Sequence, residues 1–243
     1  MEAVQHMEQP GASQPPAGFE VFGASDEFAP NQAQDARDHL VHNTRWAKAN
    51  GIPTLTWTDS KERTRPMVIV AGGPSVHDVN DELLYWCEHG DVLAINDAHD
   101  WLIEDKGIVP KMFAMHEIDA WPNDFVTKAN DETTYYIASM AHPSAFEHLK
   151  DRNLVLFHTY GGIGEGQLMI DNGDAGQPII PGGEAMSLRA INLGFLLGYR
   201  DFHMFGVDGC YRPGASHAYF DRKKIANRIR TSDGREFIAP PYL

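Results

Sequence analysis

The stretch MVIVAGGPS, residues 67–75, decides the fold class of this 243-residue chain. Its first five residues form an unbroken apolar run, which is typical of a strand buried on both faces of a parallel sheet. The two glycines, the proline and the serine make a tight turn, and residues 79–87 then show a helical pattern. A buried strand, a tight turn and a helix form the repeating unit of an α/β domain.

The same unit recurs along most of the chain. Short apolar runs predict strands at residues 67–71, 92–95, 112–115, 135–138, 154–157 and 202–205, and helical patterns predict helices at 31–50, 79–87, 98–105, 143–150 and 184–197. This alternation predicts an α/β fold with a mainly parallel, Rossmann-like sheet and helices on both faces. A glycine-rich loop is expected from 159 to 183. The turn Ser232-Asp233-Gly234 between two extended segments predicts a C-terminal β-hairpin.

Composition divides the chain into three parts. Residues 1–31 are rich in Gln, Pro, Ala, Gly and Ser, so we expect a flexible N-terminal arm. Residues 32–65 are expected to hold an N-terminal helix and a polar connector, because Asn50-Gly51 and Pro53 end the helical pattern. Residues 66–243 are then expected to form the α/β domain.

Charge and cysteine content exclude several classes of protein. Acidic residues outnumber basic ones 34 to 20, a formal net charge of -14, which argues against non-specific nucleic-acid binding. The two cysteines make no disulfide framework, so a reducing, cytoplasmic setting is expected. The longest apolar stretch, residues 191–199, is too short to span a bilayer, which takes about 20 residues. We therefore expect no membrane association, and the sequence leaves homo-oligomerisation open.

The turn after the first strand is the first candidate binding site. Ligands of open parallel sheets bind beyond the carboxyl ends of the strands. Gly72 and Gly73 let a ligand approach the backbone closely, and their amides can face an anion. After Pro74, Ser75 can donate its hydroxyl. The alternative is a tight strand-to-helix turn with no ligand. Neither the Walker nor the dinucleotide-binding glycine pattern is present.

Polar residues also follow the second and third predicted strands. Asn96 can bond a ribose or a base edge, or it can cap the next helix together with Asp97. His116, Glu117 and Asp119 follow the third strand, where their oxygens could bind Mg²⁺ or the group could act as acid and base. The alternative is an exposed loop that caps a helix.

The unit over residues 181–209 is the most distinctive part of the sequence. Gly182 and Gly183 place bare amides at the start of a helix, which suits a phosphate. Asp208 follows the last strand, where its carboxylate can hold a ribose hydroxyl, a metal or an acceptor group, or can simply stabilise a turn. The predicted apolar stripe of the helix consists of Ala185, Leu188, Ile191 and Phe195.

The glycine turn, Asn96 and the 181–209 unit together resemble the DUF115 family, also called 6-hydroxymethylpterin diphosphokinase MptE-like. The pattern is similar to that of Campylobacter-type sialyltransferases and of the Maf flagellin glycosyltransferases. The chain looks similar to short phage-encoded members. The resemblance covers about residues 66–219 and implies that residues 66–243 form a nucleotide-binding α/β domain.

The resemblance implies roles for individual residues. In the sialyltransferases the glycine turn and the strand-end asparagine bind the CMP part of the donor, and the helix start lies near the donor phosphate. Tyr211 is the candidate for a phosphate-holding tyrosine, and His217 for the general base. The family's serine at the helix start is Gly182 here, and Gly209-Cys210 shifts the spacing to Tyr211. The resemblance thus implies that the nucleotide-binding residues of this chain are Gly73, Pro74, Ser75, Asn96, Gly182 and Gly183.

The preferred function is a nucleotide-dependent transferase of the glycosyltransferase kind, with a nucleotide-sugar donor as its small-molecule ligand. Asp208 and Asn96 would position ribose or acceptor, and His217 would move the proton. The first alternative is a Mg²⁺-dependent diphosphokinase of the hydroxymethylpterin type, with Glu117 and Asp119 at the metal, although the acidic cluster expected of that group is not present. The second alternative is a non-catalytic phage structural or interaction protein that keeps the fold.

Overall fold

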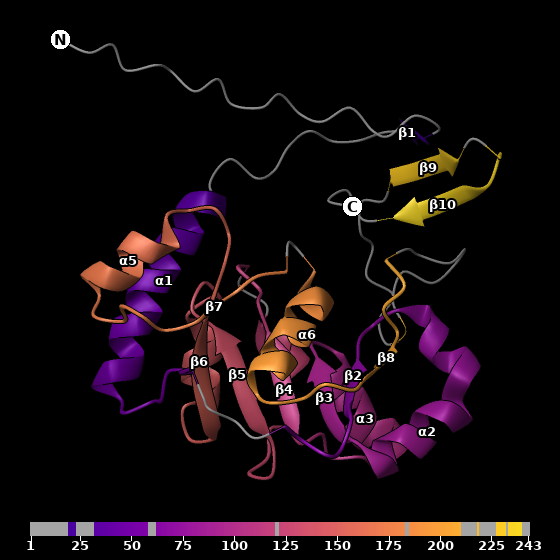
Figure 1. The fold of residues 1–243 in the computed structure, drawn as a ribbon, viewed down its shortest axis with the longest axis horizontal. Coiled ribbons are helices and arrows are strands. Elements are labelled where there is room, and N and C mark those ends of the chain that lie inside the picture. Colours follow the sequence, from indigo (N-terminus) through magenta and orange to yellow (C-terminus); the bar gives the residue numbers. More distant parts are fainter. Residues whose placement is uncertain are drawn as a thin grey trace.

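A computed structural model of the chain describes residues 19–22, 32–57, 62–119, 122–182, 185–209, 218, 227–231 and 233–239. Seven strands form its main sheet: β2 (Met67–Val70), β3 (Asp91–Ile95), β4 (Met112–Met115), β5 (Thr134–Ala138), β6 (Asn153–Thr159), β7 (Ile179–Ile180) and β8 (Phe202–Phe205). Their order is β7-β6-β5-β4-β3-β2-β8, and each neighbouring pair is parallel (Figure 1). The predicted α/β fold with a parallel sheet is confirmed.

The helices follow the strands in the alternation that the sequence predicts. The α-helices are α1 (Gln32–Ala49), α2 (Asn80–His89), α3 (Ala98–Lys106), α4 (Ser144–Leu149), α5 (Glu165–Asp171) and α6 (Met186–Leu196), and two 3₁₀ helices are η1 (Pro74–Val79) and η2 (Pro122–Phe125). Within the described residues no helix combines the length and the apolar character needed to cross a membrane.

Two hydrophobic cores lie on the two faces of the sheet. Alternate strand residues such as Val68 and Val70 pack with side chains of α1, α2, α3 and α4 on one face. The intervening residues, such as Met67 and Ile69, pack with side chains of α6. This helix covers the other face of the sheet (Figure 1). Because successive side chains of a strand point to opposite faces, a strand covered on both sides must be apolar throughout. This is why the strands are the unbroken apolar runs of the sequence.

The segment 159–183 is more ordered than the predicted glycine-rich loop. It contains α5 and the two-residue strand β7, which pairs with the end of β6. The carboxylate of Glu165, which is only 3% exposed, accepts hydrogen bonds from the amides of Gly161 and Gly162, the latter at 2.7 Å. A buried carboxylate that accepts hydrogen bonds from the loop amides therefore stabilises this segment. Such an arrangement leaves no periodic pattern of apolar residues in the sequence from which it could be predicted.

The C-terminal strands belong to a separate small sheet. β9 (Asn227–Thr231) and β10 (Glu236–Ala239) pair antiparallel, and β9 also pairs antiparallel with β1 (Phe19–Phe22), in the order β1-β9-β10. The C-terminal segment is therefore part of a three-stranded unit rather than a hairpin on its own, and Ser232 of the predicted turn lies outside the described residues. Four residues of the predicted arm contribute the third strand. The other divisions of the predicted domain scheme remain predictions.

Candidate functional site

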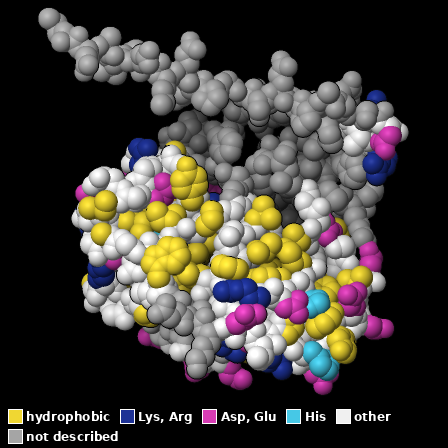
Figure 2. All heavy atoms as spheres, in the orientation of Figure 1, with side chains coloured by type: hydrophobic (Ala, Val, Ile, Leu, Met, Phe, Trp, Pro, Cys, Tyr) yellow, Lys and Arg dark blue, Asp and Glu magenta, His cyan; other side chains and the backbone are white. Residues whose placement is uncertain are grey.

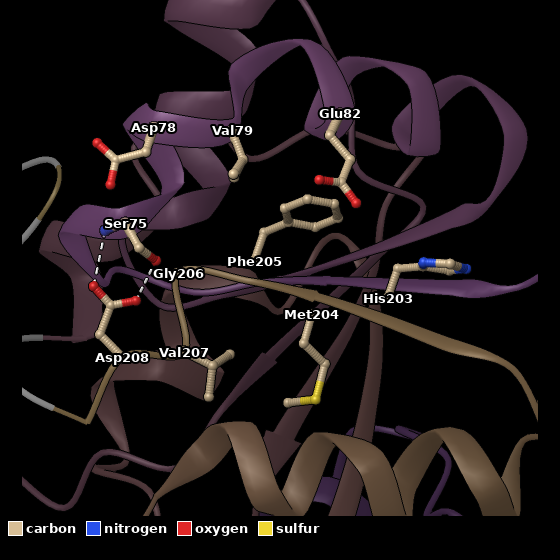
Figure 3. Close-up of a pocket in the computed structure, with 10 residues that line it drawn as sticks. All are labelled: Ser75, Asp78, Val79, Glu82, His203, Met204, Phe205, Gly206, Val207 and Asp208. Carbon is tan, nitrogen blue, oxygen red and sulfur yellow. Dashed lines mark hydrogen bonds between the residues drawn. The ribbon is translucent and has the colours of Figure 1, made fainter.

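The strand order reverses at β2, and a cavity opens at that point. From β2 the chain builds the sheet in one direction as far as β7, and it then returns to add β8 on the other side of β2. Open α/β sheets bind ligands at the carboxyl ends of strands where the order reverses. A cavity of about 460 Å³ is found there (Figure 3). It is lined by Ser75, Asp78, Val79, Glu82, His203, Met204, Phe205, Gly206, Val207 and Asp208.

The glycines at this point serve a close approach between two loops of the protein. The amide of Gly73 donates to the carbonyl of Gly206 at 2.7 Å. A Cβ atom on Gly73 would lie 2.4 Å from that carbonyl oxygen, and one on Gly206, where φ is +67°, would lie 2.1 Å from the carbonyl oxygen of Ala71. The sequence predicted that Gly73 lets a ligand approach the backbone. In the structure the group that approaches it is the loop after β8.

Asp208 is held against the same turn by Ser75. The Ser75 amide donates to Asp208 Oδ2 at 2.8 Å, and the Ser75 hydroxyl donates to Oδ1 (Figure 3). Two predicted site residues that are far apart in sequence are therefore in direct contact. Hydrogen bonds to an ionised carboxylate are stronger than those between neutral groups, so this pair fixes the orientation of the Asp208 carboxylate. The oxygens keep further lone pairs that can accept from a ligand.

The rest of the cavity combines carboxylates with apolar walls. Glu82 extends from α2 toward the edge strand β8, and Phe205 lies beneath it (Figure 3). Met204 points to the opposite side of β8, toward α6. Such a mixture of hydrogen-bond acceptors and apolar surface suits a ligand that carries hydroxyl groups on a ring.

The residue after His217 lies beside the glycine turn. The amide of Ala218 donates to the carbonyl of Gly72 at 2.9 Å, and the His77 Nε2 atom is 3.0 Å from the carbonyl oxygen of Ala218. His217 itself lies outside the described residues, as do Tyr211 and Gly183. Ala218 itself therefore lies at the turn after β2.

Asn96 has an unusual conformation at the end of β3. Its φ is +50°, and apart from glycines it is the one described residue with a positive φ. Its Oδ1 atom is buried without a hydrogen-bond partner among the described residues. The N-cap of α3 is Asp97, without a side-chain capping bond, so Asn96 does not cap that helix. A strained backbone and an unsatisfied buried acceptor are features that gather at binding sites.

The residues after β4 differ in exposure and do not form a metal cluster. His116 lies with its Nε2 atom buried, whereas Asp119 is exposed and Glu117 is half-buried. Burial, helped by the charge of Arg189, lowers the pKa of His116 to about 3. Among the described residues, no group of three or more His, Cys, Asp or Glu side chains is placed to hold a metal ion. Mg²⁺ is often held by one or two carboxylates together with water and substrate phosphates, so the assignment of Glu117 and Asp119 to a metal remains a prediction.

Gly182 lies against the first turns of α6. Its φ is +144°, and a Cβ atom there would lie 2.6 Å from the backbone nitrogen of Arg189 and 2.8 Å from its Cγ atom. Gly182 follows β7, and residues 72–75 follow β2, so both lie at the carboxyl ends of strands in one parallel sheet.

The predicted apolar stripe of this helix was wrong at Leu188 and Phe195, whereas Ile191 packs against the core. The buried residues of α6 are Met186, Arg189, Ala190, Leu193 and Gly194. Leu188 and Phe195, which were expected to face the core, are 50% and 56% exposed. Hydrophobic side chains gather on the surface over α6 (Figure 2), so the helix is apolar on most sides and spacing alone cannot identify its core face. The burial of the Arg189 cation was not predicted from the sequence. Its position three residues after Met186 and four before Leu193, both of which are buried, is the signal that could have placed it on the core face.

Comparison with known families decides what kind of domain this is. The sequence model of the family described as 6-hydroxymethylpterin diphosphokinase MptE-like matches residues 38–214. The chain belongs to the MptE-like family. The match includes the turn after β2, Asn96, α6 and Asp208, so the cavity at the strand-order reversal lies within the family domain. No curated protein matches the chain.

The MptE-like fold of this chain is also similar to a solved structure. That structure is the MAf glycosyltransferase from Magnetospirillum magneticum AMB-1, with a TM-score of 0.57 and 15% sequence identity. The similarity covers 84% of this chain and 32% of the other, so this chain spans about a third of the length of that enzyme. At this identity the likeness describes the fold.

Proposed function

We propose that this MptE-like chain is a nucleotide-dependent transferase of the glycosyltransferase kind that uses a nucleotide-sugar donor. The observation that carries the proposal is the cavity at the reversal of strand order, in which Ser75 fixes the carboxylate of Asp208. The family match supports a nucleotide-dependent transferase, and the fold likeness to a glycosyltransferase supports the choice of sugar transfer.

The proposed nucleotide contacts lie at the carboxyl ends of the strands. Asn96 follows β3, directly beside β2, and its buried Oδ1 atom would accept from a ribose hydroxyl or a base amino group. Gly72, Gly73, Pro74 and Ser75 would border the nucleoside, with Gly73 acting through the shape of the turn because its amide is bonded to Gly206. Gly182, Gly183 and Tyr211 would face the phosphate, as the family resemblance implies.

The chemical step would use Asp208 and His217. In sugar transfer, an acceptor hydroxyl forms a bond to the anomeric carbon, the bond from that carbon to the nucleotide phosphate breaks, and the hydroxyl loses its proton. A histidine near its ordinary pKa suits the role of base, and the resemblance assigns this role to His217. Asp208, held by Ser75, would accept a hydrogen bond from the acceptor or from a sugar hydroxyl. The placement of Ala218 at Gly72 supports the involvement of residue 217.

A Mg²⁺-dependent diphosphokinase is the second candidate, and the description of the matching family favours it. Such an enzyme would transfer a diphosphate from ATP to a hydroxymethyl group: the hydroxyl oxygen bonds to the β-phosphorus and loses its proton, and AMP leaves. Mg²⁺ would neutralise the charge of the phosphates. Glu117 and Asp119 are the carboxylates at the end of β4. The fold likeness is to a glycosyltransferase, so this candidate ranks second.

A thermal-shift screen of nucleotides and nucleotide sugars, with and without Mg²⁺, tests the proposal. A ligand at about 100 times its dissociation constant should add about 2.7 kcal/mol to the stability of the fold. We expect stabilisation by a nucleotide sugar without metal, reduced in Ser75→Ala and retained in Ser144→Ala, a matched change at the start of α4. His217→Ala should keep binding and lose turnover.

The outcomes separate the candidates. Stabilisation by ATP that depends on Mg²⁺ and is lost in Asp119→Asn would favour the diphosphokinase. Absence of any nucleotide effect at millimolar concentration would favour a non-catalytic interaction protein.

A further inference from the structure

Three polar side chains lie on the α6 side of the sheet near its carboxyl edge, and Arg189 is close enough to His116 for its charge to act on that imidazole. Met112 and Ala114 of β4 face the α6 side, and so does Phe157 of β6. Because side chains alternate along a strand, His116 and Thr159 continue these rows on the same side. Arg189 enters from the buried face of α6.

Arg189 is anchored at the end of β7. It is 2% exposed, and its Nη1 atom donates to the carbonyl of Ile180 at 3.2 Å. The same carbonyl accepts from the amide of Tyr160 at 3.0 Å, which joins the guanidinium to the residue after Thr159. Gly182 packs directly on Arg189. A cation therefore lies beneath the glycine that begins this turn.

His116 and Thr159 carry polar atoms that the rest of the described protein does not satisfy. Thr159 is completely buried, and its Oγ1 atom has no hydrogen-bond partner among the described residues. The same holds for the Nε2 atom of His116. The low pKa of His116, caused by burial and by the charge of Arg189, keeps its imidazole neutral at pH 7. Buried polar groups normally have partners, so these two atoms point to a ligand that would supply them.

We propose that Arg189, Thr159 and His116 form a subsite for an oxyanion, a phosphoryl or carboxylate group, at the start of α6. The helix has eleven residues, and the N-terminus of a helix favours negative charge. Arg189 adds a full positive charge, and the Thr159 hydroxyl can donate a hydrogen bond. The neutral imidazole of His116 donates a second one in the tautomer that carries its proton on Nε2. The inference rests on the proposed function, in which the phosphate of the donor lies near Gly182.

A purely structural role for these residues makes different predictions. If Arg189 only ties α6 to β7, replacing it lowers stability without a specific effect on anions. If Thr159 only fills space, replacing it by the isosteric valine changes neither property.

The test uses isothermal titration of the full chain with inorganic pyrophosphate and, separately, with glucuronate. Thr159→Val should keep or raise the melting temperature, because it removes an unsatisfied buried hydroxyl, yet weaken the preferred anion about tenfold. Arg189→Lys should weaken it at least as much. Arg200→Gln, which removes an exposed guanidinium just beyond the same helix, should leave anion affinity unchanged. The tighter of the two probes tells whether the subsite takes a phosphoryl or a carboxylate group.

Each outcome decides between the inference and the function on which it rests. Unchanged affinity of Thr159→Val for pyrophosphate and glucuronate overturns the subsite, even if Arg189→Lys fails to fold. In that case, binding of a nucleotide sugar by the wild type would still support the proposed function. If the wild type binds an anion and Thr159→Val and Arg189→Lys lose that binding, the subsite is supported. If in addition no nucleotide binds more tightly than pyrophosphate, the proposed function is overturned. Failure of the wild type to bind either anion overturns the subsite, and titration of the wild type with nucleotide sugars then decides the function separately.

Discussion

Asp208 and Ser75 form a two-point contact: the Ser75 amide is 2.8 Å from Asp208 Oδ2, and the Ser75 hydroxyl donates to Oδ1. The contact joins the loop after β2 to the loop after β8, the two strands that flank the reversal of strand order. The cavity thus depends on a bond between segments 133 positions apart in sequence. Stability and ligand binding should respond together when it is broken.

Asp208→Ala should lower the free energy of unfolding by about 2 kcal/mol and abolish ligand stabilisation, because it leaves the Ser75 amide without its acceptor. Asp208→Asn keeps the shape and one acceptor and should cost less stability. Urea denaturation and titration of nucleotide sugars measure the two effects. The control is Asp201→Asn, since Asp201 has a mostly exposed side chain and lies just before β8. Equal stability of Asp208→Ala and wild type would contradict the role of the contact.

Gly73→Ala should destabilise the fold by several kcal/mol, because the new Cβ would lie 2.4 Å from the Gly206 carbonyl oxygen and 2.7 Å from Asp208 Cγ. Gly166→Ala is the matched change, since a Cβ there meets nothing within 4 Å and Gly166 lies in α5. Alanine at an open helical position should stabilise by up to about 1 kcal/mol. Thermal denaturation compares the two. Similar melting temperatures for both variants would show that the loops separate easily.

The sequence predicted the sheet well because each strand is apolar on both faces. The bounds of β4 and β8 match the predicted runs, and β2, β3 and β5 differ by one residue at an end. The prediction of the core face failed for α6. Its exposed residues Leu188 and Phe195 are as apolar as its buried residues, so apolar character did not identify the face that packs on the sheet.

The candidate site could be predicted only in part. Topology places Ser75, Asn96 and Asp208 near the carboxyl edge once parallel strands are expected. The bond between Ser75 and Asp208 depends on which strands are neighbours, and a sequence pattern does not encode that β8 returns beside β2. The role of Gly73 and Gly206 could not be predicted either. A glycine is needed both where a ligand approaches the backbone and where another loop does, so the residue type does not tell which of the two is present. Arg189 was missed because a buried cation contradicts the usual pattern of burial.

Asp91, at the opposite end of the sheet, should govern stability without affecting the site. Its carboxylate accepts from Tyr199 at 2.6 Å and from Lys111 at 2.8 Å, and Arg65 lies nearby. Burial alone would raise the pKa of Asp91, but these hydrogen bonds and charges outweigh it and lower the pKa. Asp91→Asn should therefore destabilise the protein at pH 7 by about 1–3 kcal/mol.

The difference between wild type and Asp91→Asn should shrink in acid. A carboxyl group with a depressed pKa in the fold contributes stability above its ordinary pKa of about 3.9, and the contribution is lost as the pH falls toward the folded value. Denaturation of both proteins between pH 7 and pH 3 measures the convergence. A constant difference over that range, or a loss of nucleotide binding at pH 7, would contradict this assignment.

Two buried histidines should make the fold sensitive to mild acid. His158 lies between Ser139 and Asp174, with Nδ1 3.0 Å from the hydroxyl and Nε2 3.0 Å from the carboxylate. Burial lowers the pKa of His158 despite Asp174, and it lowers the pKa of His116 to about 3. The unfolded chain takes up protons below about pH 6.5 that the folded chain does not. Stability should then fall by up to about 1.4 kcal/mol per pH unit for each histidine.

Denaturation from pH 7.5 to pH 5 tests this expectation. His158→Gln should flatten the dependence of stability on pH, whereas the same change at His42, an exposed residue of α1, should not. If stability is level between pH 7.5 and pH 5, or if both variants lose the slope equally, burial of neutral His158 is not the cause.

The most direct test of the account is a crystal structure of the chain grown with CMP, UDP or ADP and the corresponding nucleotide sugars. The account predicts a nucleotide beyond the carboxyl ends of β2 and β3, in contact with Asn96 and bordered by residues 72–75, with its phosphate toward Gly182. A nucleotide bound at any other part of the fold, or none bound at millimolar concentration, would contradict it.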